Sequence, residues 1–204
     1  MEVFLGSSRM LAELRTSFAA LVDSLSGSSY DACGEDVIAR MWETESYAME
    51  RDRSKQEAYD EMICGCDLAF FLVDEWLGDY TLHEYRVASG SFASKGSPRI
   101  VAWVRAGAQQ PGPRPSVPVA GDVTDANLRV ILESASANPE VEVRYLDGEN
   151  AMLLEMLEII VGKLGPVSLS LHGNAVWTGH KRLVALDDVR PERVSSFERW
   201  LASR

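Results

Sequence analysis

Residues 59–105, YDEMICGCDLAFFLVDEWLGDYTLHEYRVASGSFASKGSPRIVAWVR, decide the fold of this chain. After the end of a predicted helix comes an uninterrupted apolar strand, Leu68–Val73, and then an aromatic and acidic loop over 74–80. We expect a helix to begin near Thr81 and a second apolar strand at Ile100–Val104. Strands without polar alternation, separated by amphipathic helices, are typical of a parallel sheet covered on both faces.

The carboxyl ends of these strands are where we expect the functional site. In open α/β sheets, ligands bind in the crevice at this edge. The loop after the Leu68–Val73 strand brings acidic and aromatic side chains there. The candidate cluster consists of Asp74, Glu75, Trp76, Asp79, Tyr80, His83 and Glu84.

Composition and charge narrow the classes of partner. The 204 residues, 46% of them hydrophobic and 25% charged, suit one α/β domain with a small appendage. The net charge of -11 comes with scattered lysine and arginine, so we expect no nucleic-acid partner and no membrane partner, because both require a basic face. A small anionic ligand is compatible with this charge, since a few local donors can hold it.

The cysteines and histidines predict a reduced protein without a metal. Cys33, Cys64 and Cys66 cannot all pair, and the last two are too close for an ordinary bridge, which favours a cytoplasmic location. The three histidines show no metal-ligand spacing. The N-terminus lacks the features of a signal peptide, and no apolar segment approaches the length of a bilayer.

The N-terminal part predicts a strand, a turn and a helix. The strand Glu2–Leu5 is followed by Gly6, Ser7, Ser8 and Arg9, whose backbone N–H groups, hydroxyls and guanidinium can bind an anion at a helix N-terminus. A purely steric role for this Gly-Ser turn is about as well supported. We expect a loop at Ser26–Ser29 and a second strand at Asp36–Trp42, which ends at Trp42 and Glu43.

A polar, mobile loop is predicted for 44–54, and Ser54 then begins a helix with Lys55 and Gln56 in its first turn.

Glu84 has two interpretations. Thr81 and Glu84 have the spacing of a capping box, in which the carboxylate only binds the threonine N–H. Taken alone, the residues favour this structural interpretation over a catalytic one.

The C-terminal half predicts further elements of the sheet and an appendage. A Pro- and Gly-rich surface segment precedes them. We divide the chain into an α/β domain at 1–164, a β-hairpin appendage at 165–189 and a helix or linker at 190–204. The predicted elements are a helix at 125–136, a strand at 140–145, a helix at 150–164, short strands at 167–171 and 182–186, and a helix at 191–204.

Several motifs, in this order and spacing, resemble the Toll/interleukin-1 receptor (TIR) domain superfamily. They are VFLGSS, MWETE, SKQEAYDEMICGCDLAFFLV, GDYTLHEYRVA and PRIVAWV. The chain is most similar to bacterial TIR-like domains at the N-terminus of multidomain defence proteins. The resemblance covers 1–163 and is most specific between Ser54 and Ala88. It implies a flavodoxin-like, doubly wound, five-stranded parallel sheet.

The resemblance also implies a function. Enzymatic TIR domains cleave the bond between nicotinamide and ribose in NAD with one glutamate, which corresponds to Glu84 and makes a catalytic role the favoured one. NAD is then a substrate and no cofactor is needed. Self-association, a gating loop at 44–54 and C-terminal sensor domains in a longer chain are further implications. Substrate-binding candidates are Gly6, Ser7, Ser8, Arg9, Trp42, Glu43, Lys55, Gln56, Asp74, Trp76, Tyr80 and His83.

One departure from the family and two alternatives remain. Gly78-Asp79-Tyr80 stands where many TIR domains carry a Ser-x-Trp-Cys pattern, which bears on rate and substrate choice. Nucleoside deoxyribosyltransferases share the strand order and also use a glutamate in this region, so an N-glycosidase of that kind is one alternative. A non-catalytic adaptor or nucleotide-sensing module is the other, because fold alone does not establish an enzyme.

Overall fold

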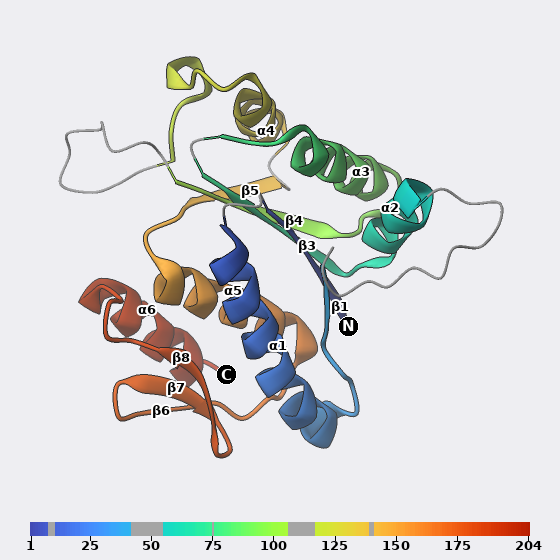
Figure 1. Cartoon of the computed structure of the whole chain (residues 1–204). Coiled ribbons are helices and arrows are strands. Elements are labelled where there is room, and N and C mark those ends of the chain that lie inside the picture. The colour runs from blue at the N-terminus through green and yellow to red at the C-terminus, as the bar shows by residue number, and fades with distance from the viewer. Residues whose placement is uncertain (8–10, 42–54, 75, 106–116, 139–140) are drawn as a thin grey trace. The chain divides into compact units, whose positions relative to one another are not determined.

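The computed structural model describes residues 1–7, 11–41, 55–74, 76–105, 117–138 and 141–204 (Figure 1). Its contacts divide the chain into two compact units. We name 2–12 with 39–145 the sheet unit, and Met1, 13–38 and 146–204 the terminal unit. Each unit is described by itself.

A five-stranded, all-parallel sheet forms the centre of the sheet unit. The strand order β2-β1-β3-β4-β5 confirms the predicted flavodoxin-like α/β class. Every residue of β3 is buried, because the strand lies in the middle of the sheet. The strands are β1 (Glu2–Ser7), β2 (Ile38–Arg40), β3 (Leu68–Val73), β4 (Arg99–Val104) and β5 (Val141–Tyr145).

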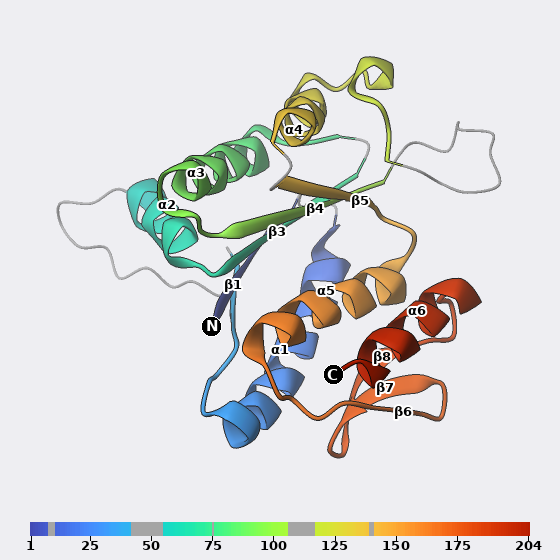
Figure 2. The ribbon, with the colours of Figure 1, turned by 180° about the vertical axis from the view of Figure 1, so that it is seen from behind.

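Three helices, α2 (Lys55–Gly65), α3 (Asp79–Lys95) and α4 (Ala126–Ala137), lie on one face of this sheet (Figures 1 and 2). Aromatic rings fill the space beneath them. The ring of Phe71 on β3 lies 5.8 Å from that of Phe4 and 5.5 Å from that of Tyr85 on α3. All three side chains are at most 2% exposed, so α3 is held firmly against the sheet.

The strand register aligns the carboxyl ends of β1, β3 and β4. Gly6 pairs with Phe71, which pairs with Ala102 on the next strand. Neighbouring strands are about 4.8 Å apart, so the residues that follow β1 and β3 emerge close together. The segment that joins β3 to α3 begins at this edge.

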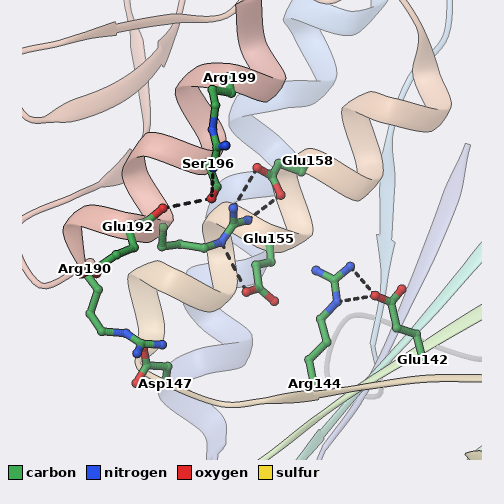
Figure 3. Close-up of polar contacts among 10 residues, drawn as sticks. Glu142, Arg144, Asp147, Glu155, Glu158, Arg190, Glu192, Ser196 and Arg199 are labelled. Atoms are coloured by element: carbon green, nitrogen blue, oxygen red, sulfur yellow. Dashed lines mark hydrogen bonds and ion pairs between the residues drawn. The ribbon is translucent and has the colours of Figure 1, made fainter. Parts of the chain in front are cut away.

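The terminal unit consists of helices and a small antiparallel sheet. It contains most of α1 (Ala12–Cys33), then α5 (Glu149–Leu164), β6 (Ser170–His172), β7 (Ala175–Thr178), β8 (Lys181–Ala185) and α6 (Pro191–Ala202). Arg193 on α6 donates to both carboxylate oxygens of Glu158 on α5 and lies 3.4 Å from Glu155 (Figure 3). These ion pairs join the last helix to α5.

The predicted loop at Ser26–Ser29 is wrong, because α1 continues through it to Cys33. Serine is usually a weak helix former, since its hydroxyl competes for backbone groups. Here the hydroxyl of Ser29 is fully buried and donates to the carbonyls of Ser26 and Glu35, each at 2.8 Å. The helix therefore accommodates the serine without an unsatisfied polar group.

Two strand predictions also need correction. The second strand begins at Ile38 and not at Asp36, and its predicted end at Trp42 lies outside the described residues. The appendage has three strands and not two, because Ala175–Thr178 forms β7 within the segment that we predicted to be a connection. Tight turns flank β7, with Asn174 at φ 56° and Gly179 at φ 55°.

None of the helices in the described part of the chain is long and apolar enough to cross a bilayer.

Candidate functional site

The start of α3 determines how Glu84 can be interpreted. The helix begins at Asp79, two residues before the predicted position, and its N-cap is Gly78, which makes no side-chain capping bond. Thr81 therefore lies inside the first turn and is 4% exposed. A capping box requires the threonine at the N-cap, so the structural interpretation of Thr81 and Glu84 as a capping box is wrong.

The carboxylate of Glu84 lies directly against the backbone of Gly6 near the end of β1. A Cβ atom built on Gly6 would be 2.9 Å from Glu84 Oε2 and 2.9 Å from the edge of the Phe71 ring. Such distances are too short for any real side chain, so only glycine leaves room for the carboxylate here. Glu84 is half-buried. The structure thus brings together two predicted site residues that are far apart in the sequence.

Two exposed aromatic rings flank the segment between β3 and α3. Trp76 is 60% exposed and Tyr80 is 81% exposed, although Leu77 between them is fully buried. Asn127 on α4 donates from Nδ2 to the carbonyl of Leu77 and to Oδ1 of Asp79, each at 2.9 Å. Sequence reasoning did not identify Asn127, because nothing in its local pattern indicates a contact with this segment.

A chain of polar contacts joins α2 to α3 beside Glu84. Nε2 of His83 lies 3.0 Å from both carboxylate oxygens of Asp60 on α2, and Nε2 of Gln56 donates to Oδ1 of Asp60 at 2.8 Å. Lys55, at the start of α2, is exposed. His83 and Gln56 therefore both contact the carboxylate of Asp60. His83, which directly precedes Glu84 in α3, is exposed.

Asp74 and Arg105 follow β3 and β4 at the same edge of the sheet. Nη1 of Arg105 lies 3.6 Å from Oδ2 of Asp74, and the Arg105 N–H donates to the carbonyl of Val73 at 2.9 Å. The side chain of Arg105 is 46% exposed, so its charge is accessible to an anion. Sequence reasoning missed Arg105, although its position immediately after an apolar strand was a usable signal.

Several predicted site residues lie outside the part of the chain that the structure describes. They are Ser8, Arg9, Trp42, Glu43 and Glu75, together with the predicted gating loop at 44–54. Ser7 is the last residue of β1 and is half-buried.

The terminal unit carries a polar surface hollow of about 400 Å³, which contains none of the predicted site residues. It has a pair of aspartates, one lysine and an exposed tyrosine, but no carboxyl end of a parallel strand and no half-buried carboxylate. We therefore regard the edge of the sheet unit as the better candidate site. The hollow is lined by Gly27, Ser28, Tyr30, Asp31, Asp36 and Lys181.

Comparisons with protein-family models, with curated proteins and with solved structures found no match to this chain. Within the described ranges, no group of His, Cys, Asp and Glu side chains has the arrangement of a metal site.

Proposed function

We propose that this protein is an NAD glycohydrolase that cleaves the N-glycosidic bond between nicotinamide and ribose. The observation that carries the proposal is the half-buried Glu84 carboxylate, which lies against Gly6 at the carboxyl edge of a parallel sheet. In flavodoxin-like folds this edge is where nucleotides bind. The absence of a Cβ atom on Gly6 leaves room for the carboxylate at this edge, where its negative charge can lie beside the sugar of a bound nucleotide.

The proposed reaction needs few protein groups. The bond between ribose C1′ and the ring nitrogen breaks, and its electron pair goes to the pyridinium nitrogen, so neutral nicotinamide leaves without a general acid. Positive charge then develops on C1′ and the ring oxygen, and the carboxylate of Glu84 stabilises it. Water adds to C1′ and loses a proton, which gives ADP-ribose, whereas internal attack would give a cyclic product.

The exposed aromatic rings suit the bases of a dinucleotide. Trp76 and Tyr80 expose 60% and 81% of their surface, so both rings are accessible for stacking. A base covering either ring would recover apolar contact and exclude water from the reacting sugar. Arg105 adds a positive charge at the same edge, where a diphosphate can bind despite the net charge of -11.

We further propose that self-association switches the enzyme on, in a cytoplasmic defence protein with additional C-terminal sensor domains. An assay at low concentration would then underestimate activity. Assays should therefore include concentrated protein and a crowding agent.

The test is product analysis by chromatography after incubation with NAD. Wild type should release nicotinamide, whereas Glu84→Gln should lose at least about 100-fold in turnover with an unchanged melting temperature. Glu133→Gln, an exposed glutamate on α4, is the matched control and should keep full activity. Equal turnover by wild type and Glu84→Gln would contradict the proposal.

The same samples separate the alternatives. Release of a base from deoxynucleosides but not from NAD would favour an N-glycosidase related to the deoxyribosyltransferases. Full biological activity of Glu84→Gln, without base release from either substrate, would favour an adaptor or nucleotide sensor.

A further inference from the structure

We propose that Asn127 on α4 is a positioning residue that holds the segment 76–80 in the conformation that presents Trp76 and Tyr80 to the substrate. The proposal concerns a residue that contacts this segment and has no chemical role. The claim that Asn127 affects substrate binding rests on the proposed NAD glycohydrolase function. The claim that Asn127 holds the segment in place does not.

The contacts of Asn127 use the donor capacity of its amide nitrogen. Nδ2 donates to the backbone carbonyl of Leu77 and to the carboxylate of Asp79, each at 2.9 Å. The amide therefore links α4 to the residues on either side of Gly78, the N-cap of α3. The N-cap of α3, Gly78, makes no side-chain capping bond, so this link from α4 acts where a local cap is absent.

Asn127 contacts the segment at the point where it enters α3. Trp76 and Tyr80 are mostly exposed, so their rings contribute little packing. Leu77 is fully buried in the core that also contains Leu128 of α4. Burial of Leu77 anchors the segment, and the two hydrogen bonds of Asn127 add a directional constraint on the Leu77 carbonyl and the Asp79 carboxylate.

Asn127 itself stands on a rigid base. It lies in the first turn of α4, where Asp125 caps the helix by accepting from the N–H of Leu128 at 2.7 Å. The two hydrogens of the amide nitrogen suit the position between these two acceptors, whereas an aspartate would place its negative charge beside the Leu77 carbonyl and the Asp79 carboxylate.

The functional consequence is a change in substrate binding more than in chemistry. A base that stacks on Trp76 or Tyr80 gains the same contact in the ground state and in the transition state, and loss of such uniform binding raises KM with little change in kcat. Loosening the segment should therefore raise KM for NAD, whereas loss of Glu84 should lower kcat.

The experiment compares Asn127→Ala and Asn127→Asp with wild type in the full chain. Steady-state kinetics with NAD should show KM raised about tenfold in Asn127→Ala, and further in Asn127→Asp, with kcat within about twofold. Adding Asp79→Asn to Asn127→Asp restores one amide-carboxylate contact and should recover part of the KM. Arg129→Ala is the matched control, because Arg129 donates to Val123 within the same helix end and not to the segment.

Hydrogen exchange without NAD provides the second readout. Backbone amides of residues 76–82 should exchange at least about tenfold faster in Asn127→Ala than in wild type or Arg129→Ala. Unchanged exchange would overturn the positioning role. Faster exchange with an equal KM would overturn only the claim that Asn127 affects substrate binding. Absence of NAD turnover in every protein would refute the proposed function, and the exchange rates would still decide whether Asn127 holds the segment in place.

Discussion

Substitution of Gly6 by alanine tests the contact on which the candidate site depends. The new methyl group would lie 2.9 Å from Glu84 Oε2 and 2.9 Å from the Phe71 ring, whereas ordinary contacts are 3.4–4 Å. Both neighbours, or the backbone of β1, must therefore move by about 0.5 Å or more. The Glu84 carboxylate is at the end of a flexible side chain and can move away. Phe71 is fully buried and packed between Phe4 and Tyr85, so its overlap with the new methyl group strains the core.

The expected effects on stability and turnover differ in size. Overpacking of this kind costs about 1–3 kcal/mol, which lowers the melting temperature of a chain of this length by about 2–4 °C per kcal/mol. A catalytic group displaced by about 1 Å loses about 100-fold in rate. Gly6→Ala should therefore remain folded at 25 °C but release nicotinamide about 100-fold more slowly than wild type.

The assay combines thermal unfolding with nicotinamide release. Gly90→Ala is the matched control, because Gly90 lies in α3 with Glu84 and a Cβ atom there meets nothing within 4 Å. That variant should gain up to about 1 kcal/mol from helix propensity and keep its activity. If Gly6→Ala matched wild type in both measurements, the close approach of Glu84 to β1 would be refuted.

Three further predictions concern other parts of the molecule. Glu142 pairs with Arg144 (Figure 3). Burial disfavours the charged form of Glu142, but hydrogen bonds and charge from Arg144 and Arg99 outweigh burial and lower its pKa. The stability that these arginines provide is therefore present above the unfolded pKa and is lost as pH falls through the folded pKa. Arg144→Gln should therefore cost up to about 1 kcal/mol at pH 7 and less at pH 2.5, as measured by urea unfolding. Arg193→Met removes the partner that Glu155 and Glu158 share and should destabilise the protein by about 1–3 kcal/mol, with partial recovery when Glu158→Gln is added; full stability of the single variant would contradict this expectation. Trp76→Ala should change unfolding free energy by less than about 0.5 kcal/mol, because the ring is 60% exposed, yet raise KM for NAD; an unchanged KM would argue against stacking on this ring.

Much of the fold was predictable because the burial of strands and helices is reflected in local runs and periodic spacing of apolar residues. The apolar runs at Leu68–Val73 and Ile100–Val104 belong to β3 and β4, and the parallel sheet follows from strands with no polar face. The helices near 126–137, 149–164 and 191–202 were also expected, since their apolar spacing is periodic. One error fell where a serine hydroxyl binds backbone carbonyls within and beyond α1, as Ser29 does. Another fell at the four-residue strand β7, which is stabilised by pairing with β6 and β8 and not by a local pattern.

The candidate site was likewise predictable in part. The apolar run before them was enough to place Trp76, Tyr80 and Glu84 near a sheet edge, because it predicts a buried parallel strand. The resemblance to TIR domains, and not the residues alone, made Glu84 the catalytic candidate. The contact of Glu84 with Gly6, the earlier start of α3 and the hydrogen bonds from Asn127 could not be foreseen. They depend on how α3 and α4 pack on strands distant in the sequence, and a displacement of about 1 Å in that packing would remove them. The spacing of apolar residues indicates which face of a helix or strand is buried, whereas side-chain contacts between elements distant in the sequence form only when those elements pack together.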